Sequence, residues 1–342
     1  MKTAKRPTIR DVAAAAGVSK SLVSMVFASD EGVSSERREK VLAAAKKLGF
    51  TPNPWARSLA TGTGEFIAIV VVDLHNPLFT EVADMARKAL LERGVQTFMT
   101  AASIQDIDGV KVLEKSTVQA LVDLKPGGIL IVGDLPDKGM MKSVAESVPI
   151  IYATTIPKNQ DRSIVLRIDE NEGMRLIIEH LVSLGHKNIC YLGLEDGDVE
   201  SARITGYRKA MQANKLTANW EKTDRTEADG YASAKRVLFA KNSPTALVCF
   251  NDILALGAQE AIQEFENSGG HQVALTGFDN TYIAALSRIS LTSIEQDKEA
   301  IAKAAAEILT DAELAERSKG KSVLQLPKLE IRNSTTSVKV QK

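Results

Sequence analysis

The sequence predicts an all-α N-terminal head with a short hinge helix, followed by a two-lobed α/β body with parallel sheets. Two observations predict this division. Residues 8–50 contain three short helical patterns separated by glycines and helix-capping residues. From residue 65 onward, short apolar runs rich in β-branched residues alternate with amphipathic stretches, which is typical of parallel sheets covered on both faces.

Charge is distributed unevenly along the 342 residues, although the 43 basic and 43 acidic residues cancel. Residues 1–64 contain eleven Lys and Arg and five Asp and Glu, whereas residues 65–342 contain 32 and 38. A basic head before an acidic body favours phosphate contact at one end of the chain. No apolar run approaches the roughly 18 residues that span a bilayer, and the first residues lack a signal-peptide core. We therefore expect a cytoplasmic protein without a membrane partner.

The first two helices of the head are predicted to form a helix-turn-helix. Thr8 is placed to cap the first helix, with Asp11 three residues later, and Gly17 ends it. Ser19 is placed to cap the second helix. In that helix the inward positions are Leu22, Val23 and Val26, and the outward positions are Lys20, Ser21, Ser24 and Met25. This order of caps around a tight turn favours a DNA-binding head over a generic three-helix domain.

A third helix is predicted from a cap at Ser34 to a stop at Gly49. Its inward positions are Val41, Leu42, Ala45 and Leu48. Pro52 then breaks the chain, and residues 53–62 contain about two helical turns, which are too few to be stable alone in water. Such a segment folds when a partner supplies the ordering free energy, and the alternative is a plain linker.

The body alternates strands and helices in two series. In the first series, strands are expected at 66–73, 95–102, 127–133 and 149–155, with helices at about 79–93 and 107–124 and one more before residue 149. In the second series, strands are expected at 163–169, 188–194, 245–250 and 271–278, with helices at 171–184, 200–214, about 228–240 and 252–265. Ligands in open α/β sheets bind at the carboxyl ends of strands, so a ligand cleft is expected between two such lobes.

Three stretches, TIRDVAAAAGVS, VSSERREKVLAAAKKLGF and PNPWARSLATG, resemble the head of the lactose-repressor (LacI/GalR-type) family of bacterial transcriptional regulators. The resemblance continues to the C-terminus. It implies that the body shares its fold with periplasmic sugar-binding proteins. It implies a DNA-binding domain at 1–50, a hinge at 51–64 and an effector domain at 65–342. The implied first lobe covers about 65–166 and 297–323, and the second about 167–294 and 324–336.

The resemblance also implies the DNA contacts. Lys20 and Ser21 would open the recognition helix in the major groove, with Ser24 and Met25 on the same face. Thr8 and Ser19 would hold phosphates. The family often has Arg where Met25 stands, and Met cannot make the bidentate contact of Arg to guanine, so an altered operator half-site is expected unless Met25 is a packing residue. The implied hinge contacts are Asn53, Ala56, Arg57 and Leu59, with Leu59 as a wedge in the minor groove.

The implied ligand contacts are polar residues that follow strands, together with one ring. They are His75, Asn76, Phe79, Arg203, Asn251, Asp279 and Gln296. An Arg, amides and acids suit a polyhydroxylated ligand such as a sugar, because Asp accepts from paired hydroxyls and Arg donates to them. The alternatives are that Asn251, Asp252 and Asp279 only cap helices, and that His75 is a solvated loop residue. Further ring packing is expected from Trp220 and Tyr282.

An enzyme is not indicated, because the four histidines are scattered and no phosphate-binding glycine motif follows a strand. Cys190 and Cys249 lie in apolar strands and are expected to be reduced and buried, and no Cys/His cluster predicts a metal. No cofactor is expected. The expected partners are double-stranded operator DNA, a small-molecule effector and a second copy of the chain, since the C-terminus lacks the leucine heptads of the tetrameric relatives. The remaining alternatives are a sugar-binding protein without a regulatory role, and a regulator that responds to a nucleobase or a phosphorylated metabolite.

Overall fold

The computed structural model describes residues 7–27, 32–51, 64, 66–102, 104–107, 110–135, 141, 146–156 and 162–336. The chain divides into two compact units, Met1–Gly64 and Glu65–Lys342, which are considered separately below as head and body. The predicted hinge contacts Asn53, Ala56, Arg57 and Leu59 lie outside the described residues. No helix in the described part is long and apolar enough to cross a membrane.

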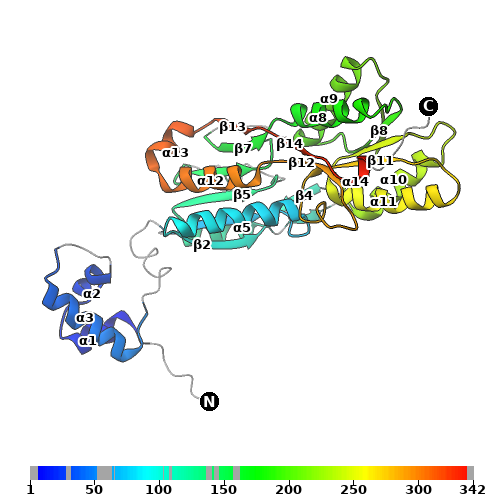
Figure 1. Ribbon diagram of the computed structural model, residues 1–342. Helices are drawn as coiled ribbons and strands as arrows, with labels where there is room; N and C mark the ends of the chain where they lie inside the picture. The colour runs from blue at the N-terminus through cyan, green and yellow to red at the C-terminus, as the bar shows by residue number, and fades with distance from the viewer. Residues whose placement is uncertain are drawn as a thin grey trace. The chain divides into compact units, whose positions relative to one another are not determined.

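The head contains helices α1 (Ile9–Ala16), α2 (Lys20–Phe27) and α3 (Ser35–Leu48) (Figure 1). Thr8 caps α1, and the Asp11 carboxylate accepts hydrogen bonds from the backbone N and Oγ1 of Thr8, both at 2.7 Å. Gly17 ends α1 with φ +66°, a left-handed conformation that glycine adopts without strain. Ser19 caps α2 by accepting from the Leu22 backbone N. These local predictions are confirmed.

The head core is made of small and β-branched side chains from all three helices. Its buried members are Val12, Ala13, Val23, Val26, Val33, Val41, Ala44 and Ala45. The predicted inward face of α3 is partly wrong, because Leu42 and Leu48 are exposed and Ala44 is buried in their place. Leu42 is rotated by about 100° from the buried Val41, and Leu48 is the last residue of α3, so both lie away from the centre of the buried face.

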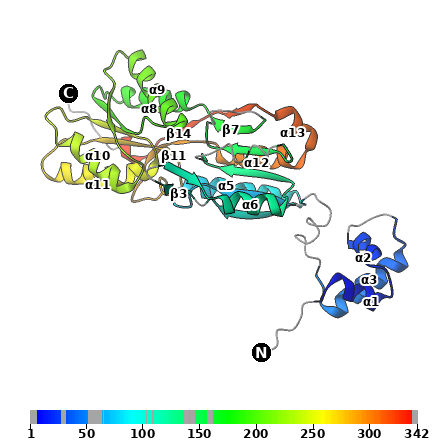
Figure 2. The ribbon, with the colours of Figure 1, turned by 180° about the vertical axis from the view of Figure 1, so that it is seen from behind.

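The body contains two sheets that each have six described strands. The first sheet has the order β13-β7-β6-β5-β1-β2 and is parallel throughout. Its strands are β1 (Phe66–Val71), β2 (Gln96–Ala101), β5 (Gly128–Val132), β6 (Ile150–Ala153), β7 (Ile164–Ile168) and β13 (Ser322–Gln325). Helices α5 (Pro77–Glu92) and α12 (Lys298–Thr310) pack against each other and against this sheet, and α6 (Lys115–Leu124) is seen best from behind (Figure 2).

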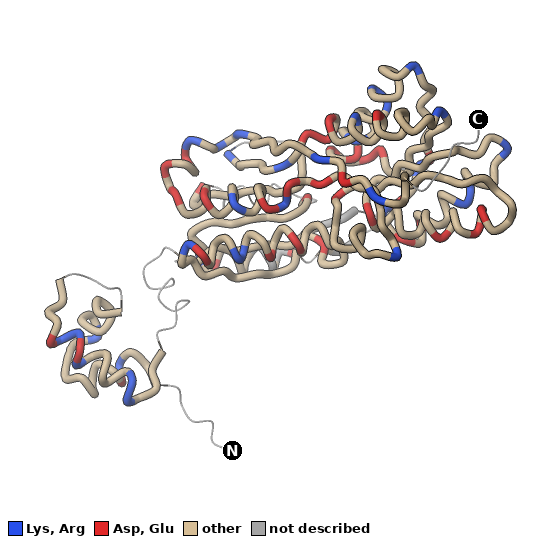
Figure 3. Tube along the Cα trace, viewed as in Figure 1, with Lys and Arg blue, Asp and Glu red and all other residues tan. Residues whose placement is uncertain are grey.

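The second sheet has the order β14-β12-β11-β10-β8-β9, and only β14 is antiparallel to its neighbour. Its strands are β8 (Ile189–Gly193), β9 (Asn219–Lys222), β10 (Ala246–Cys249), β11 (Ala274–Asp279), β12 (Thr292–Glu295) and β14 (Lys328–Glu330). The helix pair α8 (Glu170–Ser183) and α9 (Asp198–Ala213) lies on one side of it, and the pair α10 (Glu227–Leu238) and α11 (Asp252–Asn267) on the other (Figure 1). Helices α8, α9 and α10 contain both acidic and basic residues, whereas the charged residues of α11 are all acidic (Figure 3).

The chain passes between the two lobes three times, as expected. It leaves the first sheet after β7, returns after β12 to form α12, α13 (Ala312–Ser318) and β13, and then enters the second sheet as β14, which the short helix α14 (Asn333–Thr336) follows. Strand β7 belongs to the first sheet, so the assignment of residues 163–169 to the second series is wrong. An apolar run predicts a buried strand, but it does not specify which sheet the strand joins.

The helix predicted at 107–124 is only half correct. The described residues 104–107 and 110–113 form an antiparallel hairpin, β3 (Ile104–Ile107) with β4 (Val110–Leu113), and α6 begins at Lys115. The segment IQDIDGVKVL alternates β-branched and polar residues around Asp108-Gly109, which is a hairpin pattern that the helical interpretation overlooked. Strand β9 was not predicted either, because NWEK is polar and lies at a sheet edge.

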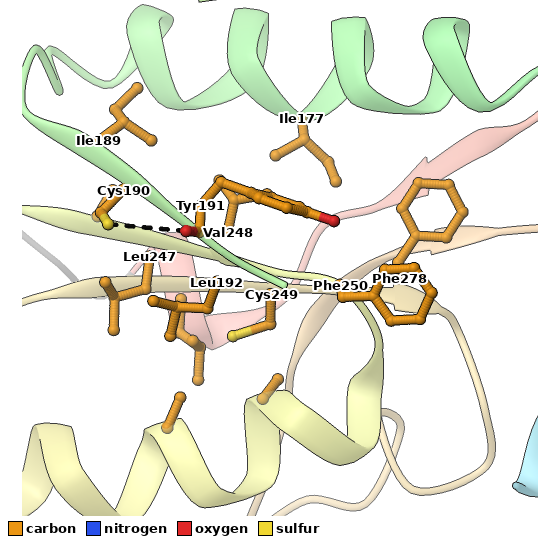
Figure 4. Close-up of a cluster of buried hydrophobic side chains, with 14 of the residues drawn as sticks. Ile177, Ile189, Cys190, Tyr191, Leu192, Leu247, Val248, Cys249, Phe250 and Phe278 are labelled. Atoms are coloured by element: carbon orange, nitrogen blue, oxygen red, sulfur yellow. Dashed lines mark hydrogen bonds between the residues drawn. The ribbon is translucent and has the colours of Figure 1, made fainter. Parts of the chain in front are cut away.

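The second-lobe core surrounds the central strands β8 and β10. In Figure 4, Tyr191 lies on the same side of the sheet as Ile177 of α8, whereas Leu192 and Cys249 point toward α11. Both cysteines are buried and unpaired, as predicted. Burial, together with the nearby Glu221, raises the pKa of Cys190 to about 12, and burial raises the pKa of Cys249 as well. The thiols therefore remain protonated packing groups.

Candidate functional site

One face of α2 in the head is polar and exposed. Lys20, Ser21 and Ser24 are exposed, as the helix-turn-helix interpretation predicts. Met25 is half-buried against the head core, so the packing alternative describes it better than an outward base contact. The Nη1 of Arg38 on α3 donates to the carbonyl of Val26 at 3.3 Å, which holds the last turn of α2. Helix α2 therefore exposes a lysine and two hydroxyls on one face.

The N-termini of α1 and α2 differ as anion sites. The hydroxyl and N–H of Thr8 already donate to Asp11, so a phosphate at α1 would meet a carboxylate. Ser19 is exposed, and Lys20 follows it at the start of α2 with no acidic residue in the first turn. The α2 terminus is the better phosphate site of the two. The roles of Thr8 and Ser19 on DNA remain predictions.

The body contains a cavity of about 660 Å³ between its two lobes. It is lined by Val72, Asp73, His75, Asn76, Leu78, Phe79, Ile104, Asp134, Thr154, Thr155, Gly197, Val199, Glu200, Arg203, Arg225, Thr226, Glu227, Phe250, Asn251, Ile253 and Asp279. Six of the seven predicted ligand contacts belong to this set. The seventh, Gln296, does not.

Arg203 of α9 is the most constrained charge in the cavity and is only 3% exposed. Its Nε donates to Glu170 at 2.8 Å, its Nη1 to the Phe250 carbonyl at 2.5 Å, and its Nη2 to Asp279 at 3.3 Å. Its guanidinium lies 3.7 Å from the centroid of the Phe278 ring and 4.6 Å from that of Phe250. The side chain is therefore fixed before any ligand arrives.

Asp279 ends β11 at the bottom of the cavity, in a backbone conformation with φ +105° that non-glycine residues rarely adopt. Its Oδ1 accepts from Arg203 and, at 2.6 Å, from Nε2 of Gln296. Burial raises the pKa of Asp279 to about 7, although Arg203 opposes the shift. Gln296 is absent from the cavity lining, and its contact with Asp279 orients that carboxylate. Its role as a ligand contact remains a prediction.

The two candidate amides each cap a helix and also line the cavity. Asn251 Oδ1 accepts from the Leu254 backbone N at 2.8 Å, and Asn76 Oδ1 accepts from the Leu78 backbone N at 3.1 Å. Their capping role and their position on the cavity surface are thus compatible, because the cap uses the oxygen and leaves the NH₂ group. Asp279 does not cap a helix, so that alternative does not hold for it.

The remaining predicted contacts lie on the first lobe. His75 is exposed, its backbone N donates to Asp73 Oδ1 at 2.8 Å, and its ring Nδ1 lies 3.5 Å from the same oxygen. Phe79 is half-buried on α5 and lines the cavity. The expected rings of Trp220 and Tyr282 do not line it, since Trp220 is exposed beneath Arg208 and Tyr282 is exposed elsewhere. Phe250 supplies a second ring instead.

Several lining residues were not predicted. Thr154 and Thr155 follow β6 just as Asn251 follows β10, so the strand-end argument applied there would have found them. Thr155 is 1% exposed and its Oγ1 has no hydrogen-bond partner in the described part of the chain. Arg225 pairs with Glu200, and Glu227 begins α10. No sequence signal marked Arg225 or Glu200, because they meet only when α9 and the loop before α10 come together.

A second layer of buried polar groups supports Asp279. Asp252 accepts from the backbone N and the hydroxyl of Thr281, at 2.7 and 2.9 Å, and from Ser293 at 2.6 Å. Burial raises the pKa of Asp252 to about 6. Asp252 therefore holds the loop that follows Asp279 and does not face the ligand.

Direct polar contacts join the lobes beside the cavity. Glu81 of α5 accepts from the Tyr282 backbone N at 2.8 Å, and its other oxygen lies 3.8 Å from Nζ of Lys298. That Nζ also donates to the carbonyls of Asp279 and Asn280. The backbone at the bottom of the cavity is thus linked to a first-lobe helix by two contacts.

The comparisons with known proteins agree with both units. A family model described as "Bacterial regulatory proteins, lacI family" matches residues 8–53, and one described as "Periplasmic binding protein-like domain" matches residues 178–335. The HTH-type transcriptional repressor PurR of Mannheimia succiniciproducens is 31% identical and covers 97% of this chain and 99% of its own. The HTH-type transcriptional regulator DegA of Bacillus subtilis is 30% identical, with coverage of 97% and 98%.

Solved structures show the same architecture over the whole chain. The lac repressor dimer bound to operator and the anti-inducer ONPF has a TM-score of 0.80 at 26% identity, and covers 97% of this chain and 99% of its own. A CelR–cellobiose complex has a TM-score of 0.67 at 25% identity, with coverage of 96% and 100%. These relatives are regulators and not enzymes. With its helix-turn-helix head and two-lobed cavity, the chain belongs to the LacI family of bacterial regulatory proteins and is a DNA-binding transcriptional regulator.

Proposed function

We propose that this regulator represses transcription from the cytoplasm by binding a palindromic operator as a homodimer, and that a small polar ligand in the interlobe cavity controls its affinity for DNA. The observation that carries the proposal is the cavity itself. It is large enough for a small metabolite, and it brings Arg203, Asn251 and Asp279 of one lobe opposite Asn76 and His75 of the other. A ligand that contacts both sides stabilises one interlobe angle over others.

A polyhydroxylated ligand, most simply a sugar, fits this lining best. Carboxylates and amides of the cavity can accept from and donate to paired hydroxyls, and the Phe79 and Phe250 rings can cover an apolar sugar face. The CelR relative was solved with cellobiose, which supports the same class of ligand. The two rings also suit a flat nucleobase, which is the alternative.

The DNA side of the proposal rests on α2. Lys20, Ser21 and Ser24 would face the major groove, with Ser19 and the α2 N-terminus on a phosphate. Two heads in a dimer would then require half-sites about one helical turn apart in an operator of roughly 16–20 base pairs. Asn53, Ala56, Arg57 and Leu59 remain proposed minor-groove contacts, with Leu59 as the wedge.

Coupling between ligand and DNA would run through the interlobe angle. A change in that angle would alter the spacing of the two first lobes and so the pairing of two hinge segments. A typical coupling free energy of about 1–3 kcal/mol changes DNA affinity roughly 5- to 150-fold. Because coupling is reciprocal, operator DNA would change ligand affinity by the same factor.

The test begins with selection of duplex sites by the full-length protein, followed by titration of the best site by fluorescence anisotropy. We expect a twofold-symmetric site, and weaker binding when Lys20 or Leu59 is replaced by Ala. The control is Lys303→Ala, which removes an exposed body lysine. Ligand affinity should stay unchanged in Leu59→Ala. Selection of asymmetric or random sites, or equal loss of both affinities in Leu59→Ala, would contradict the proposal.

A further inference from the structure

The cavity has an excess of negative charge. Among the described residues that line it, five are carboxylates and two are guanidinium groups. The carboxylates are Asp73, Asp134, Glu200, Glu227 and Asp279, and they come from both lobes. The formal balance of these seven side chains is −3, or −2 when the buried Asp279 is protonated.

Both guanidinium groups of the cavity are already paired with carboxylates of the protein. Arg203 donates to Glu170, Asp279 and the Phe250 carbonyl, and its side chain is 4% exposed. Arg225, whose side chain is 49% exposed, is paired with Glu200, whose side chain is 8% exposed. A phosphate or carboxylate that reached Arg203 would have to displace a carboxylate of the protein, which would leave that carboxylate buried and unpaired. At Arg225 an anion would compete with Glu200 for the guanidinium, and the other carboxylates of the lining would repel it.

Helix dipoles act in the opposite direction, because the N-terminus of a helix attracts anions. The N-cap residues of α5, α9, α10 and α11 all line the cavity, and each helix N-terminus acts as about +0.5 of an elementary charge. The caps Asn76, Thr226 and Asn251 each use an oxygen to accept a terminal N–H. At α9, the Glu200 carboxylate folds back so closely over Gly197 that a Cβ there would overlap it. Side chains of the protein thus already occupy part of each anion site.

A buried hydroxyl of a residue that lines the cavity lacks a hydrogen-bond partner. Thr155 is 1% exposed, it lines the cavity, and its Oγ1 has no partner among the described residues. A buried hydroxyl without a hydrogen bond is costly, so it indicates a group that the ligand supplies. It follows Thr154, whose φ of +61° is rare for a β-branched residue and is a strained conformation of the kind found at binding sites.

We propose that the effector is a polyhydroxylated molecule that carries a protonated amine. For one carbon skeleton, the cavity has the highest affinity for the cationic form, a lower affinity for the neutral form and the lowest for an anionic form. This inference rests on the proposed function, because it concerns the charge of the ligand in the same cavity. It excludes phosphorylated sugars and sugar acids as effectors.

The experiment compares matched triplets on the full-length protein by isothermal titration calorimetry. Each triplet holds one skeleton as alcohol, amine and phosphate ester: glucose, glucosamine and glucose 6-phosphate, and likewise for galactose, mannose and sorbitol. In at least one triplet we expect the amine to bind roughly 3- to 10-fold more tightly than the alcohol, which is the scale of one partly screened charge pair. The phosphate should give no measurable heat, and added salt should weaken binding of the amine alone.

Two variants, each of which removes one negative charge from the cavity, test which carboxylates produce the preference for the amine. Asp73→Asn keeps the oxygen that accepts from the His75 backbone N, and Glu227→Gln keeps the shape of an exposed side chain at the start of α10. Each should reduce the preference for amine over alcohol about 3-fold or more. Glu260→Gln, which removes an exposed carboxylate of α11 outside the cavity lining, is the control and should leave the preference unchanged. Thr155→Val should weaken the amine and the alcohol alike.

The outcomes separate the two proposals. If a phosphate ester or an alcohol is the tightest ligand of a triplet, the charge preference is wrong, but the cavity remains an effector site provided that operator affinity responds. If an amine binds first but operator affinity never changes, the charge preference holds and the regulatory role of the cavity is wrong. If no amine binds in any triplet, or if Glu260→Gln matches the cavity variants, the inference is overturned.

Discussion

The two sides of the cavity are built differently. On the second lobe, Arg203, Asn251 and Asp279 are each 3–4% exposed and interlocked with buried partners. On the first lobe, Asp73 and His75 are exposed and held only by a local turn. A side chain fixed by several buried contacts keeps its geometry when the lobes move, whereas a turn can adapt. The second lobe is therefore suited to select the ligand, and the first lobe to close on it.

Among the cavity residues, the largest effect on stability is expected at Arg203. Arg203→Ala should destabilise the body by about 3–5 kcal/mol, because it leaves Glu170 and Asp279 as buried carboxylates without their cation. Urea unfolding of the full chain, followed at the body transition, measures this. The matched control is Arg208→Ala, which removes an exposed arginine of the same helix and should change stability by less than about 1 kcal/mol.

If both arginine variants destabilise equally, the second-lobe residues are not interlocked as described. At temperatures where Arg203→Ala stays folded, it should have lost the ligand response and kept operator binding. An unaltered response would remove Arg203 from the ligand site.

A pH dependence is expected from Asp279. Its pKa is raised from 3.8 to about 7 by burial, so between about pH 4 and pH 7 the native protein holds a proton that the unfolded chain has released. Stability should therefore fall as pH rises through this window. In Asp279→Asn the loss of unfolding free energy between pH 4 and pH 7 should be smaller, by up to about 4 kcal/mol. Thermal unfolding of both proteins from pH 4.5 to 7.5 tests this, and parallel profiles would show that Asp279 does not carry the effect.

The two capping amides, one on each lobe, differ in burial, so the loss of one capping hydrogen bond should cost more stability on the second lobe than on the first. Asn251→Ala should cost about 1–2 kcal/mol, since its cap is buried, and Asn76→Ala about 0.5–1 kcal/mol at its half-exposed cap. Asp at either position should restore the cap. For ligand affinity, Asn251→Asp should still be impaired because it lacks the NH₂ group. If Asn251→Asp binds ligand normally, that residue has only a structural role.

The smallest effect is expected at the contact between the lobes. Glu81→Gln keeps an oxygen for the Tyr282 backbone N but removes the charge that faces Lys298. We expect a stability change below about 1 kcal/mol and a shift of a few-fold in ligand affinity. The control is Glu92→Gln at the other end of α5. A change in ligand affinity of equal size in the control would show that the interlobe contact does not influence closure.

Much of the fold could be predicted from the chain alone, because local chemistry decides it. Asp11 three residues after Thr8 makes a cap, and Gly17 and Gly49 permit the left-handed turns that end α1 and α3. Continuous apolar runs such as Phe66–Val71 and Ala246–Cys249 became strands buried on both faces. The expectation that polar residues after the strands line a ligand cleft also placed Asn76, Asn251 and Asp279 on one cavity.

The wrong predictions share a cause, which is that they depend on neighbours distant in sequence. Leu42 and Leu48 have helical spacing, but the way α3 packs on the other two helices leaves both exposed. Strand β7 has the same pattern whichever sheet it joins. Gln296 is absent from the cavity lining, and its contact with Asp279 depends on the packing of β11 against β12.

The amino acid order by itself determined the helix caps, the strands, the glycine turns and the helix-turn-helix that assigns the chain to its family, since each depends on residues within a few positions. Only the tertiary structure decided which charges neutralise one another. Glu170 and Arg203 are 33 positions apart, and Arg203 and Asp279 are 76 apart. Coulomb and hydrogen-bond energies act through space and not along the chain, so the excess negative charge of the cavity becomes visible only after folding.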